Sequence, residues 1–267
     1  MKWTIAATLV VVALVGCKQS GLKYERALDD GPSFSAYLVS YESSGLKLHA
    51  MVAVPSASMP ADGFPVIVAN HGYVPDPTRY GITAEGIDSR PGDYYRSVPE
   101  LYASRGFLVV LPDYRGHNSS EGLGFTGSAQ SVDYYAEDVI ALLELLEQVE
   151  SVNLDRIFMW SHSMGGGVSM RALLATDLVR GASFWATMSL QDLLSRSGEL
   201  NASIMIQHSS TDATTQSSNS QEFADALEAA GLPYEFHVYP GSDHYFEDLD
   251  RETAADRDAA FFQSLTE

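Results

Sequence analysis

Short apolar runs alternate with amphipathic helical patterns along the chain from Ser35 onward. A run rich in β-branched and aromatic residues that ends at turn residues predicts a strand, whereas apolar residues three and four positions apart predict a helix. The predicted strands are residues 36–41, 46–54, 66–70, 107–111, 156–160, 182–187, 204–208 and 234–239. The predicted helices are residues 95–104, 134–149, 164–175, 220–230 and 251–265. This alternation predicts an α/β domain with a mostly parallel eight-stranded sheet flanked by helices.

Two local patterns refine this prediction. The first two strands are joined by Ser43-Ser44-Gly45, which predicts an antiparallel hairpin. In the helix over residues 134–149, apolar side chains recur at helical spacing, and they are Val139, Leu142, Leu143, Leu146 and Val149. We interpret this stripe as core that covers the sheet and not as a binding site.

Two connections bear on access to a site. Residues 73–94 have no apolar period and are dense in Pro, Gly, Asp and Tyr, so they predict a long functional loop. By contrast, few residues separate the predicted strands 182–187 and 204–208, which leaves no room for a large lid between them. The sequence therefore predicts an open site.

The composition limits the possible partners. With 267 residues and 45% hydrophobic content, the chain is long enough to build one catalytic domain with a sizeable core. Lys and Arg total 16 against 35 Asp and Glu, for a formal net charge of −19. A field of that sign repels phosphate backbones, so the charge argues against a nucleic-acid partner. The simplest interpretation of this acidity is a well-solvated surface.

The strongest chemical signal is the segment around Ser163, where a strand passes through a small-residue turn directly into a helix. A nucleophile elbow needs small residues two positions before and two after the nucleophile. Around Ser163 these are Ser161 and Gly165, whereas around Ser161 they would be Met159 and Ser163, a poorer fit. The pattern is S-x-S-x-G instead of the usual G-x-S-x-G. A glycine-rich helix start capped by serine is the alternative interpretation.

A serine nucleophile needs a base and a carboxylate that orients it. His244 follows the last predicted strand, and Asp212 follows the strand before it. Open α/β sheets place their sites at the carboxyl ends of strands, and the order Ser163, Asp212, His244 is the usual triad order of this architecture. Asp243 and Asp192 are the competing acids, but Asp243 adjoins the histidine and Asp192 lacks a suitable preceding strand.

Acyl transfer also needs backbone N–H groups directed at the developing oxyanion. We predict one donor at Met164, directly after the nucleophile, and the other at Tyr73, in the loop after residues 66–70. His71 in the same loop is interpreted as a structural hydrogen-bonding residue. The chain's seven histidines form no H-E-x-x-H motif, so no metal site is predicted. Hydrolysis through a covalent acyl-enzyme on serine is expected to need no organic cofactor either.

These segments resemble the α/β-hydrolases, and above all the catalytic domain of the prolyl oligopeptidase (S9) family. The resemblance is carried by His71-Gly72-Tyr73, the run Leu111–Gly122, the elbow, Asp212 and His244. It implies the α/β-hydrolase fold and a serine hydrolase that cleaves a small ester or a peptide, as an S9-like peptidase or a carboxylesterase. Within the run, Arg115 is expected to pair with a nearby carboxylate. The alternative is a non-catalytic surface lipoprotein that uses the fold as a binding module.

The N-terminus has the shape of a signal peptide, with Lys2 before an apolar run from Ile5 to Val15. Leu14-Val15-Gly16-Cys17 resembles the lipobox of bacterial lipoproteins, and Cys17 is the only cysteine. We expect a signal peptide over residues 1–16, a lipidated Cys17 with a polar tether over 17–34, and a catalytic domain over 35–267. An ordinary signal peptide with a free thiol is the alternative. Because Lys18 and not Asp follows Cys17, the expected location is the cell envelope, anchored by lipid in the outer membrane.

Overall fold

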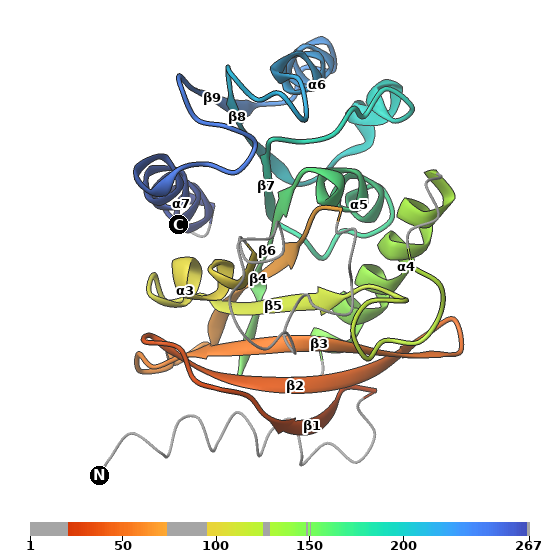
Figure 1. Ribbon diagram of the computed structural model, residues 1–267, viewed down its shortest axis with the longest axis vertical. Coiled ribbons are helices and arrows are strands. Elements are labelled where there is room, and N and C mark those ends of the chain that lie inside the picture. The colour runs from red at the N-terminus through yellow and green to blue at the C-terminus, as the bar shows by residue number, and fades with distance from the viewer. Residues whose placement is uncertain (1–20, 74–94, 125–128, 148, 150, 266–267) are drawn as a thin grey trace. The chain divides into compact units, whose positions relative to one another are not determined.

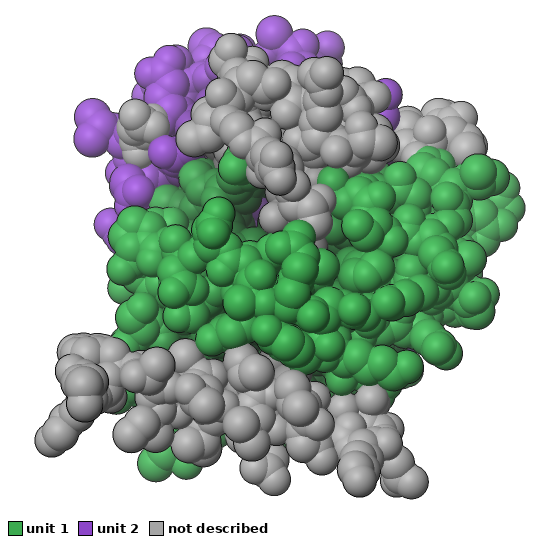
Figure 2. Space-filling view, turned by 60° about the horizontal axis from the view of Figure 1, so that its bottom comes forward, with its two compact units in different colours: residues 1–69, 74–157 green, residues 70–73, 158–267 purple. Residues whose placement is uncertain are grey.

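The computed structural model describes residues 21–73, 95–124, 129–147, 149 and 151–265. The chain forms two compact units (Figure 2). Unit 1 comprises residues 1–69 and 74–157, and unit 2 comprises residues 70–73 and 158–267. The predicted signal peptide, Cys17 and most of the predicted loop over residues 73–94 lie outside the described residues.

The strands form a nine-stranded sheet in the order β1-β2-β3-β5-β4-β6-β7-β8-β9 (Figure 1). Their bounds are Lys23–Ala27, Phe34–Ser43, Leu46–Pro55, Phe64–Asn70, Leu108–Asp113, Val152–His162, Gly181–Trp185, Ser203–Ser209 and Tyr234–Tyr239 for β1 to β9. The pairs β4–β5, β6–β7, β7–β8 and β8–β9 are parallel, whereas β1, β2, β3 and β5 pair antiparallel in that order. The chain therefore has the mostly parallel α/β-hydrolase sheet that the sequence predicted.

The hairpin of unit 1 lies where the sequence placed it. Strands β2 and β3 pair antiparallel from Phe34↔Pro55 to Ser43↔Leu46. Ser44 and Gly45 both have positive φ, at 50° and 76°. Two such residues in succession match the twist of the flanking strands, which is why this turn suits a tight hairpin.

The first strand was not predicted and makes the sheet one strand larger than expected. β1 lies in the stretch that we expected to be a polar tether, and it pairs antiparallel with β2. Most of its side chains are exposed, so it shows no apolar alternation. Polar contacts join Glu25 to the neighbouring strands instead: its carboxylate accepts the Ser40 hydroxyl at 2.6 Å and lies 2.7 Å from the Lys47 ammonium.

All five predicted helices are present, with shifted ends. They are α3 Val98–Ala103, α4 Ala129–Leu146, α5 Met164–Leu173, α6 Ser217–Ala229 and α7 Asp248–Ser264. In α4 the predicted stripe is buried, with Val139, Leu142 and Leu143 fully inaccessible. Between β7 and β8 the chain forms one short 3₁₀ helix, η3 Leu194–Glu199, in keeping with the expectation of no large lid there. No helix in the described part of the chain combines the length and apolarity needed to span a bilayer.

Arg115 has the structural role expected of it. Its Nη2 lies 2.6 Å from Oδ1 of Asp138, and its Nε donates to the same carboxylate at 3.0 Å. The backbone N–H of Arg115 donates to Asp138 as well, at 3.1 Å. Asp138 is fully buried, so its charge is matched by a guanidinium and a peptide N–H.

Asp113, at the end of β5, is a buried carboxyl group with one side-chain donor in the structure. Burial raises the pKa of Asp113 to about 8, against the opposing hydrogen bond from Asn118 Nδ2 at 2.9 Å. The folded protein therefore binds this proton more tightly than the unfolded chain does. The contribution of Asp113 to the free energy of unfolding is accordingly greatest below the ordinary aspartate pKa, and it is lost as the pH rises from about 4 to about 8.

We expect Asp113→Asn to remove this pH dependence, because an amide stays neutral and its oxygen still accepts the Asn118 bond. The free energy of unfolding at pH 8 should rise by about 1–2 kcal/mol over the wild type, with little change at pH 4. Urea unfolding at both pH values measures it. Asp29→Asn, at an exposed position, controls for the loss of one negative charge. A parallel shift of the variant and wild-type curves at all pH values would contradict the assignment.

Candidate active site

Ser163 lies in a strained turn between β6 and α5. Its φ and ψ are 56° and −121°, a region that non-glycine residues rarely occupy. Backbone bonds hold the turn: Ser163 N–H donates to the Trp185 carbonyl at 3.0 Å, and the Ser163 carbonyl accepts N–H groups from Gly166 and Met188. Ser163 is half-buried, and α5 begins at the next residue. This is the backbone geometry of a nucleophile elbow.

The small residues around Ser163 are required by close approach. A Cβ on Gly165 would lie 2.0 Å from the carbonyl oxygen of Asn70, and one on Gly166 would lie 2.1 Å from the Thr187 hydroxyl. Ser161 is fully buried, and its hydroxyl donates to the Ser183 carbonyl at 3.1 Å. The S-x-S-x-G spacing thus lets α5 approach the chain that follows β4.

The predicted oxyanion loop is in contact with this helix. The amide of Asn70 donates to the Ser169 hydroxyl on α5 at 2.8 Å, and the Gly165 contact involves the Asn70 and His71 backbone. Buried His71 has its Nδ1 2.9 Å from the Gly72 carbonyl. Tyr73 follows, with 48% of its surface exposed. The roles of Tyr73 and Met164 as oxyanion donors stay predictions.

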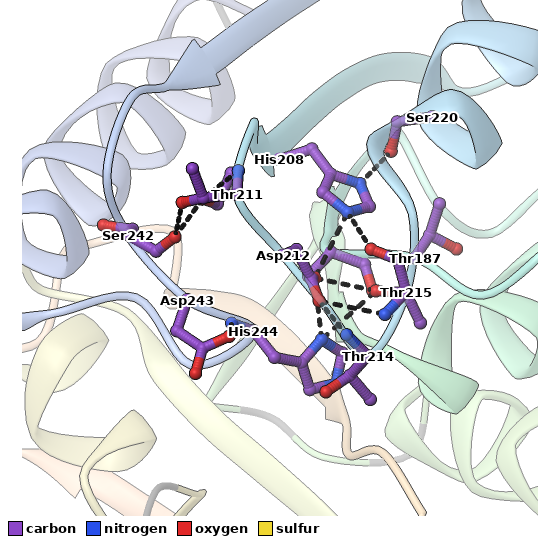
Figure 3. A network of polar contacts seen from close by, with 12 residues as sticks. Thr187, His208, Thr211, Asp212, Thr214, Thr215, Ser220, Ser242, Asp243 and His244 are labelled. Carbon is purple, nitrogen blue, oxygen red and sulfur yellow. Dashed lines mark hydrogen bonds and ion pairs between the residues drawn. The ribbon is translucent and has the colours of Figure 1, made fainter.

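Asp212 and His244, from the loops after β8 and β9, are brought together by the fold (Figure 3). His244 Nδ1 lies 2.8 Å from Asp212 Oδ2. The carboxylate also accepts the N–H groups of Thr214 and Thr215, at 2.8 and 2.9 Å, and the Thr215 hydroxyl at 2.8 Å. Burial would raise the pKa of Asp212, but the bonds from His208, His244 and Thr215 outweigh it and lower that pKa. The carboxylate is therefore ionised, and Nδ1 of His244 is the protonated nitrogen that faces it.

His162, directly before Ser163, joins the His244 loop to the turn at Ser163. Its Nε2 lies 2.9 Å from the His244 carbonyl, and the centroids of the two rings are 4.5 Å apart. Burial, together with the neighbouring His244, lowers the pKa of His162 to about 3. A neutral ring in this position donates Nε2–H to the His244 backbone. Since His162 is covalently linked to Ser163, this contact places the His244 loop against the elbow.

The competing acids have other partners. Asp243 accepts the backbone N–H of His244 at 2.7 Å, and Asp192 lies 2.6 Å from Nη2 of Arg171. The sequence did not single out His162, His208 or Thr215 as parts of the site. Their positions next to Ser163 and within four residues of Asp212 are the signal that could have found them. Within the described ranges, no group of three or more His, Cys, Asp and Glu side chains is arranged to hold a metal ion.

Comparisons with known proteins agree with the fold. The serine aminopeptidase (S33) family matches residues 82–192, and the prolyl oligopeptidase family matches residues 183–267. The chain therefore has the α/β-hydrolase fold, and parts of its sequence resemble serine peptidases of these two families. An uncharacterised peptidase of Bacillus subtilis, YtmA, is 31% identical over 160 residues, which are 59% of this chain and 52% of that protein.

Two solved structures show the likeness of the fold. Dipeptidyl peptidase 4 of Porphyromonas gingivalis has a TM-score of 0.69 at 18% identity, over 87% of this chain and 36% of that one. An acetyl xylan esterase from a Paenibacillus species has a TM-score of 0.65 at 18% identity, over 97% and 92% of the two chains. This chain thus spans about half of its curated relative and about a third of the dipeptidyl peptidase.

We expect Gly165→Ala to destabilise the protein, because its methyl group would overlap the Asn70 carbonyl. The expected loss is about 2 kcal/mol, or about 5 °C in Tm. Differential scanning calorimetry measures it. Gly198→Ala is the matched control, since a Cβ there meets only Ala230, at an ordinary 3.7 Å. Equal Tm values for the two variants would contradict the close approach.

Proposed function

We propose that this protein is a serine hydrolase that cleaves ester or amide bonds through an acyl-enzyme on Ser163. The observation that carries the proposal is the Asp212–His244 pair, whose loop contacts the elbow through His162. A binding module would need neither a strained serine at a helix start nor a buried, ionised carboxylate on a histidine. Both features favour turnover over the non-catalytic alternative.

The proposed mechanism uses only side chains and peptide groups of this chain. Nε2 of His244 accepts the Ser163 hydroxyl proton as the oxygen attacks the substrate carbonyl carbon, and the carbonyl electron pair moves to the oxygen. The N–H groups of Met164 and Tyr73 stabilise that oxyanion. The imidazolium, held by Asp212, gives its proton to the leaving alcohol or amine. In the second half of the reaction, His244 accepts a proton from a water molecule as the water oxygen attacks the acyl carbonyl carbon. The imidazolium then gives that proton to the Ser163 oxygen, and the acid is released.

An ester is the substrate class that we favour. The esterase named above matches this chain over nearly the full length of both, whereas the dipeptidyl peptidase is covered over about a third of its length. Peptide bonds are the second candidate, because both matching families and the curated relative are described as peptidases. For location, we propose attachment to the bacterial outer membrane through a lipid on Cys17, on the strength of the lipobox-like sequence.

We expect the purified protein to hydrolyse a short-chain aryl ester faster than an aminoacyl anilide. Ser163→Ala should lower kcat/KM by at least about 1,000-fold, because it removes the nucleophile. Ser161→Ala is the matched control: it loses one hydrogen bond and should stay within about tenfold of wild type. Initial rates measure both. Anilide cleavage that exceeds ester cleavage would favour the peptidase, and full activity in Ser163→Ala would refute the proposed nucleophile.

A further inference from the structure

His208 is a fully buried histidine at the end of β8, four residues before Asp212 (Figure 3). Its Nε2 lies 2.9 Å from the Thr215 carbonyl oxygen and 3.2 Å from Asp212 Oδ2. Both oxygens are acceptors, so Nε2 must carry a proton. Its Nδ1 lies 2.7 Å from the hydroxyl of Ser220 on α6, which is also fully buried. That hydroxyl can donate to Nδ1 of a neutral ring, which agrees with a proton on Nε2.

Thr215 gives His208 a second connection to the same carboxylate. The Thr215 N–H donates to Oδ1 of Asp212 at 2.9 Å, and its hydroxyl lies 2.8 Å from Oδ2 and 3.1 Å from Nδ1 of His244. By holding the Thr215 carbonyl, the His208 N–H therefore fixes the residue that supplies two of the donors to Asp212. The carboxylate is constrained directly from one side and through Thr215 from the other.

Resting on the proposed function, we propose that His208 is a positioning residue whose Nε2–H, together with Thr215, holds the Asp212 carboxylate in the orientation that accepts Nδ1–H of His244. It touches neither the substrate nor the reacting atoms. Its place near the end of β8, a strand that pairs with β7 and β9, links the orientation of the carboxylate to the sheet.

A spectroscopic consequence separates this role from simple packing. The titratable groups around the pair are His208 on β8, His162 on β6, and Asp243 and Tyr245 beside His244. The Nε2–H of His208 donates to the Thr215 carbonyl and lies close to Asp212 Oδ2, so it helps to fix the oxygen that faces His244. Without that donor Thr215 and the carboxylate are less restrained, so the hydrogen bond from Nδ1–H of His244 weakens and its proton becomes less deshielded.

The test compares two amide variants of the full chain. In His208→Gln the side-chain amide reaches the position of Nε2 and can still donate to Asp212 and Thr215. In His208→Asn it reaches only the position of Nδ1, beside Ser220. His237→Gln is the matched control. This histidine also lies beside a carboxylate, with its Nε2 3.2 Å from Glu235 Oε2, but that carboxylate is not Asp212.

The downfield ¹H NMR signal of the His244 Nδ1–H reports this hydrogen bond directly and needs no substrate. We expect His208→Asn to move this signal upfield or broaden it beyond detection, and His208→Gln and His237→Gln to leave it at the wild-type position. With the ester substrate, His208→Asn should lower kcat at least about tenfold with KM within about twofold, because orientation acts on the transition state. His208→Gln should recover most of kcat.

An unchanged His244 Nδ1–H signal in folded His208→Asn would overturn the inference, as would a His208→Gln variant that is no better than His208→Asn. If His208→Asn does not fold, the wild type supplies the test: ¹⁵N chemical shifts must show the His208 proton on Nε2, and a proton on Nδ1 alone overturns the inference. Absence of ester hydrolysis by the wild type would count against the proposed function. It would leave the NMR test of the His208 contacts unaffected.

Discussion

The ionised carboxylate of Asp212 is the group on which the site depends. Taking a carboxylate out of water is costly unless donors surround it, and here the donors come from separate parts of unit 2: Thr214 and Thr215 in its own turn, His208 on β8, and His244 in the loop after β9. Satisfying one buried charge therefore fixes the ends of two neighbouring parallel strands. The same contacts direct Nδ1 of His244 at the carboxylate, and the other ring nitrogen, Nε2, is the one that we propose as the base.

A steric constraint at the elbow complements this electrostatic one. Gly165 has no room for a side chain beside the Asn70 carbonyl, so α5 and the chain after β4 meet closely at the residue after Met164. Ser163 adopts a positive φ in this turn, and its backbone hydrogen bonds to Trp185 and Met188 maintain that conformation. His162 connects the two constraints, since its Nε2 bonds to the backbone of His244. This hydrogen bond therefore holds the strained turn at Ser163 and the Asp212–His244 pair next to each other.

Apolar runs predicted the eight strands, the five helices and the hairpin at Ser44-Gly45, because these elements bury side chains with a period that can be read locally. Strand β1 was not predicted because its exposed residues have no apolar pattern. It is held instead by its pairing with β2 and by the contacts of Glu25 with Ser40 and Lys47. The Asp212–His244 contact followed from strand-end positions. The contributions of His162, His208 and Thr215 did not, since each depends on which side chains meet across loops in three dimensions. The ends of helices shifted because capping and packing determine them more than periodicity does.

Above all, we propose that His244 and Asp212 activate Ser163. Mass spectrometry of the protein after treatment with a fluorophosphonate, which reacts with activated serines, tests this claim without a choice of substrate. We predict one phosphonyl group, located on Ser163 by peptide mapping, and little or no labelling in His244→Ala over the same time. Labelling on Ser161 or another residue, or equal labelling of Ser163 in His244→Ala, would contradict the account.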